Sequence, residues 1–281
     1  MSLVDRLLVE SADPLIMGIL NVTPDSFSDG GRYTQHDQLK QRIQALVDQG
    51  AHIIDIGGES TRPGASNVSL QEELDRVLPA IELAKQHSDC WVSIDTYKTG
   101  VMRESLALGV DMINDVNALQ SVGALELLAS SDVAICLMHK QGQPQDMQAS
   151  PVYEDVLKQV HSFLIERVKA CELAGIDGKR LVLDPGFGFG KRVEHNQILF
   201  QNLALLTQLD FPVLVGVSRK TMIGEILNGL PVNQRMVGSV VAAVLAAQRG
   251  AKIVRVHDVL ETVQALNLAK ALTSESLQIL E

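Results

Sequence analysis

The sequence has few aromatic residues, few cysteines, no excess of basic residues and no long apolar run. Aromatic residues make up only 4% of the 281 residues, with a single tryptophan. Lysine and arginine number 24 against 34 aspartates and glutamates, so the formal net charge is −10 at pH 7. This acidic balance argues against a surface that binds nucleic acid or another polyanion. It still allows a local anion pocket built from a few basic side chains.

The cysteine usage and the lack of a spanning segment predict a soluble protein. Cys90, Cys136 and Cys171 are odd in number and contain no CxxC pair, which favours ordinary thiols in a reducing compartment. No apolar run approaches the ~18 residues that a membrane span requires. Residues 1–10 carry charges and do not read as a signal peptide. We expect a cytoplasmic protein with no membrane partner.

The chain does contain a regular alternation of short apolar runs and helical stretches. Apolar residues account for 46% of the sequence, enough for a large core. Eight apolar runs separated by amphipathic segments imply parallel strands joined by helices. The expected strands are 15–20, 52–56, 91–94, 111–113, 133–138, 181–183, 212–217 and 253–254. We therefore predict an α/β fold, a single (β/α)8 TIM-barrel domain over residues 1–281.

Helical periodicity occupies the segments between these runs. Ser69 and Glu72 have the spacing of a capping box before one of the helices. Residues 237–247 are apolar almost all round, which is typical of a buried helix, often one that packs against a partner. The expected helices are 35–49, 70–86, 96–108, 121–129, 153–174, 195–208, 233–249 and 257–272.

Two long segments rich in Gly, Ser, Pro and Asp interrupt the pattern. Residues 23–33 follow the first strand and residues 59–69 follow the second. Loops at the carboxyl ends of barrel strands surround the active site of this fold. Long loops in that position usually act as lids or binding segments, so we expect both to be mobile.

Two carboxylates and an amide end three of the expected strands. Asp95, Asn114 and Asp184 would all project into the same barrel mouth. Together they are suited to a planar heterocycle with several N–H donors, such as an aminopyrimidinone. Each residue alone is as readily explained as a helix cap. Their recurrence at three equivalent strand ends favours a binding site.

A set of basic and polar residues at other strand ends predicts an anion site. Arg255 and His257 alternate along the eighth strand, so their side chains face the same way. With Asn21, Thr61 and Arg62 they would bind a phosphate group. The competing explanation for Arg255 is a salt bridge to a carboxylate at the rim. Asn21 and Asp29 also offer oxygen ligands for Mg²⁺, which prefers a few protein oxygens together with phosphate and water.

Lys220 and the glycine-rich segment 184–191 are the remaining candidates. Lys220 either donates a hydrogen bond to a ligand or acts as a Schiff-base nucleophile, which needs a lowered pKa. The spacing in 184–191 does not match a Walker loop, but its glycines allow a ligand to approach the backbone. Phe189 would supply an apolar wall or pack against a helix. Met138 is more often a core residue than a pocket floor.

Several motifs in this order resemble the signatures of the dihydropteroate synthase family. GILNVTPDSFSDGG at 18–31 and DIGGESTRPG at 55–64 are the most specific, and the resemblance extends over the whole barrel. The shorter matching motifs are SIDT at 93–96, IND at 113–115, DPGFGFGK at 184–191, SRK at 218–220 and RVHD at 255–258.

The resemblance implies a transferase of folate biosynthesis. It would join 4-aminobenzoate to (7,8-dihydropterin-6-yl)methyl diphosphate through an SN1-like pterin cation, with Mg²⁺ as cofactor and sulfonamides as competitors. It also implies a homodimer.

The expected catalytic residues are Asp95, Asp184, Lys220 and Arg255. The pterin would be held by Asp95, Asn114, Met138, Asp184, Phe189, Lys220 and Arg255, and the diphosphate by Asn21, Thr61, Arg62, Arg255 and His257. 4-Aminobenzoate would contact Phe27, Pro63, Phe189 and Ser218, and the metal would be bound by Asn21 and Asp29.

Three departures from the family pattern and three alternative functions accompany this prediction. Lys140 stands where an apolar residue is usual, and Thr221 and Ser239 replace a common serine and threonine. None of the three is expected to touch the chemistry. The alternatives are a pterin-dependent methyltransferase, a Schiff-base aldolase that uses Lys220, and an inactive pterin-binding protein.

Overall fold

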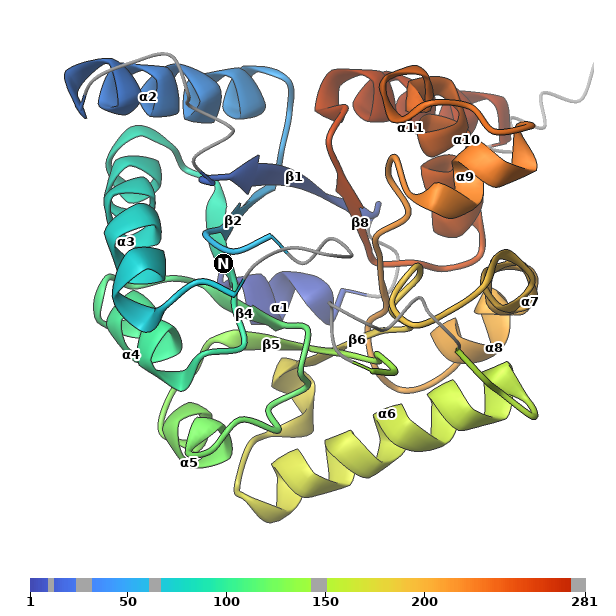
Figure 1. Cartoon of the computed structure of the whole chain (residues 1–281), viewed down its shortest axis with the longest axis horizontal. Coiled ribbons are helices and arrows are strands. Elements are labelled where there is room, and N and C mark those ends of the chain that lie inside the picture. Colours follow the sequence, from blue (N-terminus) through green and yellow to red (C-terminus); the bar gives the residue numbers. More distant parts are fainter. Residues whose placement is uncertain (10–12, 24–31, 61–66, 143–150, 274–281) are drawn as a thin grey trace, which may run out of the picture.

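The protein folds as a barrel of eight parallel strands surrounded by helices (Figure 1). A computed structural model describes residues 1–9, 13–23, 32–60, 67–142 and 151–273. The strands are β1 (Leu15–Asn21), β2 (Ile53–Gly57), β3 (Trp91–Asp95), β4 (Met112–Asp115), β5 (Ala134–Met138), β6 (Leu181–Asp184), β7 (Leu214–Val215) and β8 (Ile253–Val256).

Strand pairing follows the order β6-β5-β4-β3-β2-β1-β8-β7, and each neighbouring pair in this order is parallel. A parallel bridge between Leu183 of β6 and Val213, next to β7, connects the two outer strands. The predicted (β/α)8 barrel is therefore confirmed.

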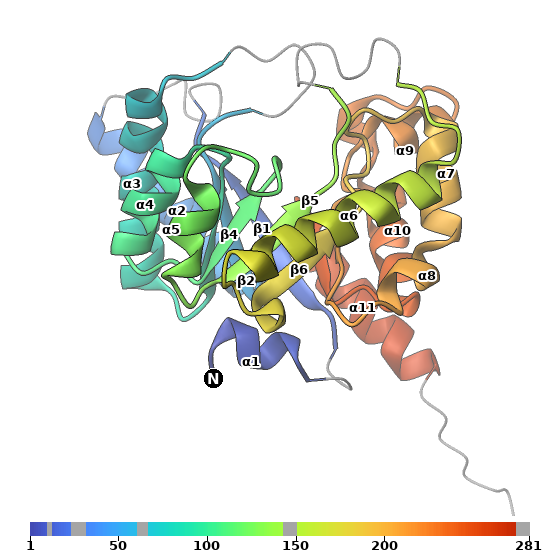
Figure 2. The same ribbon diagram turned by 90° about the horizontal axis from the view of Figure 1, so that it is seen from below.

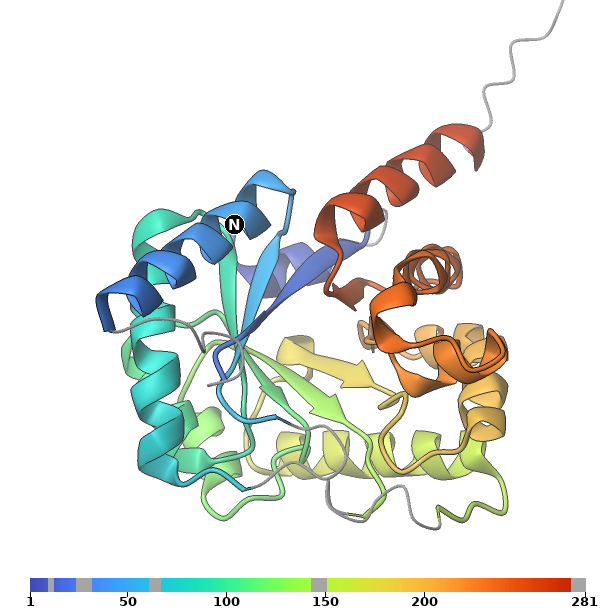
Figure 3. The same cartoon turned by 45° about the horizontal axis from the view of Figure 1, so that its top comes forward.

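Helices cover the outside of the barrel and separate consecutive strands (Figures 1 and 3). The helices are α1 (Leu3–Leu7), α2 (Arg32–Asp48), α3 (Leu70–His87), α4 (Thr99–Ala107), α5 (Ala124–Ala129), α6 (Val156–Leu173), α7 (Val193–Gln201), α8 (Leu203–Thr207), α9 (Thr221–Ile226), α10 (Met236–Gln248) and α11 (Val259–Thr273). Short 3₁₀ turns lie at Gly178–Arg180 and Val232–Gln234.

Most expected helices are found with slightly different ends, and one is divided. The expected helix 195–208 is split into α7 and α8 at Asn202. The Asn202 amide donates to the Ile198 carbonyl at 2.8 Å, a local bond that competes with the regular helical pattern. At Ser69 the predicted capping box is confirmed, since Ser69 and Glu72 exchange side-chain and backbone hydrogen bonds. Helices α1 and α9 were not expected from the sequence.

The barrel has an apolar interior that is closed at its amino-terminal end. Side chains from seven strands, including Met17, Ile53 and Cys136, form one buried cluster. Leu3 and Leu7 of α1 join this cluster, and α1 lies across the end of the barrel where the strands begin (Figure 2). The opposite end, where the strands finish, is the end available for a site.

Helix α10 is only partly covered by its own barrel. Ser239, Ala243 and Ala246 are buried, whereas Val237 and Val241 on the other face are 67% and 53% exposed. The expectation of an all-round apolar helix holds for its sequence, but within one chain a single face is packed. Within the described part of the chain, the helices are too short or too polar to cross a membrane.

Candidate active site

Arg255 lies at the centre of a charged network inside the barrel mouth. Its Nε donates to Asp55 Oδ2 at 2.6 Å, and its Nη2 donates to Asp95 Oδ2 at 2.8 Å. The Asn114 amide donates to the same Asp55 oxygen at 3.3 Å. Neighbouring strands bring these groups together, since Asp95 stands opposite Asn114 in the β3–β4 register. Carboxylates from two strands, β2 and β3, thus bind one guanidinium group from β8.

Asp55 is the functional candidate that the sequence interpretation missed. Its side chain is fully buried in β2, between two isoleucines. A buried carboxylate needs a charged or hydrogen-bonding partner. An aspartate within an apolar strand was therefore a usable signal, although the sequence alone did not show that Arg255 is its partner. The salt-bridge alternative for Arg255 is realised, within the barrel rather than at its rim.

The environment of Asp95 and Arg255 shifts both of their pKa values. Burial raises the pKa of Asp95 to about 7, against the opposing effect of Arg255. One guanidinium cannot neutralise both Asp95 and Asp55, and the second carboxylate adds to the rise. Burial by itself would lower the pKa of Arg255, but Asp55 and Asp95 hold it above its usual value.

Lys220 and Asp184 lie near enough to influence each other electrostatically on the β6–β7 side of the mouth. Burial lowers the pKa of Lys220 to about 8, and Asp184 opposes this fall. Burial also raises the pKa of Asp184, with Lys220 acting in the opposite direction. Lys220 Nζ donates to the Phe187 carbonyl and lies 4.5 Å from the centre of the Phe189 ring. The predicted pterin residues from β6 and β7 are therefore close neighbours.

The ends of β7 and β8 are joined by Ser218 and His257. Ser218 Oγ lies 3.0 Å from His257 Nδ1 and accepts a hydrogen bond from the His257 backbone N–H at 3.2 Å. His257 follows the last residue of β8, Val256. These two residues were assigned to different substrates, 4-aminobenzoate and diphosphate, and the structure places them in contact.

Asn21 occupies the exposed end of β1 beside an open position at Gly57. A Cβ on Gly57 would lie 3.8 Å from Asn21 Oδ1 and 3.9 Å from Asp95 Oδ2. Glycine therefore leaves space between an amide oxygen and a carboxylate oxygen. Within the described residues there is no group of three or more His, Cys, Asp or Glu side chains that fits a metal ion. Any metal at Asn21 would thus take few ligands from this part of the chain.

Of the remaining predicted residues, only some lie within the described part of the chain. Met138 is buried at the end of β5, opposite Asp184 in the β5–β6 register. Five predicted residues lie outside the described part of the chain, namely Phe27, Asp29, Thr61, Arg62 and Pro63.

Two of the three departures have defined environments. Lys140 Nζ lies 5.9 Å from the centre of the Tyr97 ring. Ser239 Oγ accepts a hydrogen bond from the Arg219 backbone N–H at 2.8 Å, directly before Lys220. Ser239 therefore supports the segment that carries Lys220.

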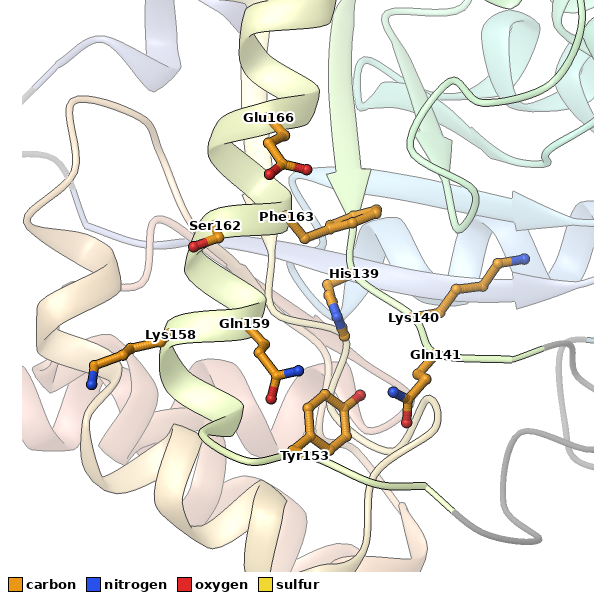
Figure 4. A pocket seen from close by; sticks show the side chains of 9 residues that line it. All are labelled: His139, Lys140, Gln141, Tyr153, Lys158, Gln159, Ser162, Phe163 and Glu166. Atoms are coloured by element: carbon orange, nitrogen blue, oxygen red, sulfur yellow. The ribbon is translucent and has the colours of Figure 1, made fainter.

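A separate cavity lies behind the barrel mouth, between α6 and the segment after β5. It has a volume of about 420 Å³ and an open entrance. His139, Tyr153 and Phe163 form its aromatic side (Figure 4). None of the predicted catalytic residues lines this cavity. The candidate active site is instead the set of charged groups at the strand ends.

Comparison with known proteins identifies the family that this chain is similar to. The family model of pterin binding enzymes matches residues 17–257. The chain is 48% identical over 266 residues to the dihydropteroate synthase of Escherichia coli K12, covering 95% of this chain and 94% of the relative.

Solved structures extend the agreement to the fold. A Yersinia pestis dihydropteroate synthase in complex with a sulfonamide drug has a TM-score of 0.88 and 51% identity, covering 94% of this chain and 95% of the other. A Xanthomonas albilineans dihydropteroate synthase with 4-aminobenzoic acid has a TM-score of 0.88 and 49% identity, covering 94% of each chain.

Proposed function

The chain belongs to the pterin-binding enzymes and, among them, to the dihydropteroate synthases, and on this premise we propose its reaction. It joins 4-aminobenzoate to the methylene carbon of (7,8-dihydropterin-6-yl)methyl diphosphate and releases diphosphate and 7,8-dihydropteroate. The observation that carries the proposal is the meeting of Asp95, Asn114 and Arg255 in one barrel mouth that also holds the Asp184–Lys220 pair.

The pterin is assigned to the polar groups from β3, β4, β6 and the segment after β7. Asp95 and Asp184 accept hydrogen bonds from ring N–H groups, and Asn114 both donates and accepts. Lys220 donates to a ring acceptor. Arg255, held from behind by Asp55, lies against the face of the ring. Met138 and Phe189 supply apolar contacts.

The charges support a dissociative step. The bond between the methylene carbon and the diphosphate oxygen breaks first, and the positive charge spreads over the pterin. Three carboxylates (Asp55, Asp95 and Asp184) then face two cations (Arg255 and Lys220), so an extra positive charge in the mouth is stabilised. The nitrogen of 4-aminobenzoate forms the new C–N bond, and its proton is released to solvent.

The leaving group is assigned to the β1 and β8 side of the mouth. His257 and Asn21 lie there, and Thr61 and Arg62 belong to the same assignment. Asn21 fits a hard cation because its exposed amide oxygen borders the open position at Gly57. Mg²⁺ bound by Asn21 and Asp29 would offset the negative charge of the departing diphosphate. Ser218, Phe189, Phe27 and Pro63 are assigned to 4-aminobenzoate.

The proposal includes two further properties of the protein. We assign it to the cytoplasm, in keeping with the absence of a spanning helix within the described residues. We also propose a homodimer, since α10 leaves an apolar face exposed.

The decisive experiment is incubation of the protein with both substrates and Mg²⁺. We expect diphosphate and dihydropteroate in equal amounts, inhibition by a sulfonamide in competition with 4-aminobenzoate, and loss of tight pterin-diphosphate binding in Arg255→Ala. Arg249→Ala is the control, because Arg249 stacks on Phe200 outside the mouth. Methyl transfer instead of diphosphate release would indicate the methyltransferase, and no product with bound pterin would indicate the inactive binding protein.

A further inference from the structure

Lys191 is a buried lysine that the proposed reaction does not use. Its side chain follows the glycine-rich turn after β6 and is 3% exposed. Among the described residues no carboxylate lies within ion-pair distance of its ammonium group. Burial lowers the pKa of Lys191, so its amino group depends on the neutral acceptors around it.

Those acceptors come from the turn itself and from the end of β5. Lys191 Nζ donates to the Gly186 carbonyl at 2.8 Å and to the Phe189 carbonyl at 3.1 Å, and it lies 2.9 Å from His139 Nδ1. A longer contact joins Nζ to the His139 carbonyl at 3.4 Å. These four contacts surround an amino group that has at most three N–H bonds to donate. Lys191 therefore connects both ends of the turn to His139.

The turn cannot take this shape without glycine. Gly186 has φ +67°, and a Cβ there would lie 1.8 Å from the His139 carbonyl oxygen. Gly190 has φ +62°, and its Cβ would lie 2.1 Å from the Gln141 carbonyl oxygen. The turn is thus pressed against the segment after β5, and two of its carbonyl groups are directed at Lys191. Without a donor these carbonyls would be left unpaired.

His139 is held as a neutral acceptor for Lys191. Its ring packs edge-on against Phe163, with centroids 5.0 Å apart, at the wall of the cavity beside α6 (Figure 4). Burial, with a further contribution from Lys191, lowers the pKa of His139 to about 3. The hydrogen-bond network therefore assigns the ring proton to Nε2 and leaves Nδ1 to accept.

The outer side of the same turn faces the candidate active site. Lys220 Nζ donates to the Phe187 carbonyl and stands over the Phe189 ring. The Gly186 N–H donates to Asp184 Oδ1 at 2.7 Å. Lys191 binds carbonyl groups of this turn on the side of His139. The side chains of Asp184, Phe189 and Lys220 lie on the other side, toward the mouth.

We propose that Lys191 is a positioning residue for the dihydropteroate synthase reaction. Its ammonium group, bound to His139, sets the shape of the turn and thereby the positions of Phe189 and Lys220. This inference rests on the proposed function. It assigns a role to a lysine that touches neither substrate.

The test compares Lys191→Met with Lys158→Met. Methionine keeps the apolar stem and removes the donors, and Lys158 lies on the rim of the neighbouring cavity, paired only with Asp155 at the surface. Because buried carbonyls lose their donor, we expect the KM for 4-aminobenzoate to rise about tenfold and kcat to fall in Lys191→Met. The KM for the pterin substrate should rise less, because only Lys220 and Phe189 among the proposed pterin residues are displaced. Asn114 and Asp95 are held by other contacts. Lys158→Met should match the unmodified protein.

A measurement on the unmodified protein keeps the proposal falsifiable if Lys191→Met does not fold. Imidazole ¹⁵N shifts, with the His139 signal assigned by its loss in His139→Gln, should show a neutral Nε2–H ring throughout pH 5–8. Titration of His139 in that range would overturn the proposal, as would unchanged KM and kcat values in a folded Lys191→Met. Failure of the proposed function looks different, because the unmodified protein would then make no dihydropteroate.

Discussion

Ser218 Oγ lies 3.0 Å from His257 Nδ1, so a residue assigned to 4-aminobenzoate is hydrogen-bonded to one assigned to diphosphate. A ligand that engages His257 necessarily changes the acceptor or donor available to Ser218. The two proposed substrate positions are therefore joined by contacts between the segments that follow β7 and β8.

This contact predicts ordered binding of the substrates. 4-Aminobenzoate should bind appreciably only when diphosphate is present, and Ser218→Ala should reduce that dependence. We expect a diphosphate-induced gain of at least about tenfold in the unmodified protein and about twofold in the variant. Titration calorimetry with and without diphosphate measures both ratios, with Ser130→Ala as the surface control. Equal affinity for 4-aminobenzoate in the empty protein would contradict the prediction.

The raised pKa of Asp95 predicts that activity falls at acidic pH. Its pKa is raised to about 7 by burial, and the carboxylate form is needed to accept a pterin N–H. The kcat/KM for the pterin substrate should therefore fall about tenfold per pH unit well below pH 7. The Asp95→Asn variant should have a low kcat/KM that no longer falls with decreasing pH in this range.

The same group predicts a change in stability. Since the folded protein holds the Asp95 proton more tightly than the unfolded chain, whose value is near 3.8, this group stabilises the fold at low pH. That contribution is lost as the pH rises from about 4 to 7. Denaturant unfolding of the unmodified protein and Asp95→Asn should show the difference, and parallel pH dependences would refute it.

The lowered pKa of Lys220 predicts that activity falls at alkaline pH. The same residue distinguishes the proposed transferase reaction from a Schiff-base aldolase. Burial lowers its pKa to about 8, so its donor capacity for the pterin should weaken above that pH. Lys220→Met should flatten this fall and lower kcat/KM by about 100-fold. Borohydride added during turnover should trap nothing on Lys220. A covalent adduct there would instead support the Schiff-base aldolase.

Asn21 predicts a requirement for Mg²⁺. Removal of the metal with a chelator should stop turnover, and Mg²⁺ should restore it. Asn21→Ala should raise the Mg²⁺ concentration for half-maximal activity about tenfold, because one of few oxygen ligands is lost. Asn202→Ala is the control, since that side-chain amide makes an exposed hydrogen bond to the Ile198 carbonyl of α7. Full activity of the unmodified protein in the chelator would rule out the metal.

The exposed face of α10 predicts a dimer. Val237, Val241 and Leu245 recur at helical spacing and are 67%, 53% and 37% exposed. Sedimentation should give a dimer for the unmodified protein and a monomer for Val241→Asp, because a charge there cannot be buried without a partner. Val122→Asp, at a side chain that is 97% exposed in the segment between β4 and α5, should remain dimeric. A monomeric unmodified protein would contradict the assignment.

The period of the apolar residues was sufficient to place nearly every strand and helix. Errors arose where a local contact altered a regular pattern. Asn202 divides one expected helix. Of the expected strand 212–217 only Leu214–Val215 forms β7, and Val213 makes an isolated bridge to Leu183. The short helices α1 and α9 lack enough turns to show a period.

The same distinction between local patterns and contacts distant in the sequence applies to the candidate site. Asp95, Asn114 and Asp184 were identified because their strand ends are recognisable in a linear pattern. Asp55 and Lys191 were missed because their importance depends on partners elsewhere in the chain. Asp55 meets Arg255 across 200 residues, and Lys191 meets His139 across 52.

The amino-acid sequence by itself determined the barrel, the end of it that carries the chemistry and the family, because strand period, helix period and motif spacing are local properties. Only the tertiary structure decided which charges are paired, since strand register brings distant side chains within hydrogen-bond distance. Burial at those contacts then sets the pKa values of Asp95, Lys220 and His139, and no property of a linear chain contains that information.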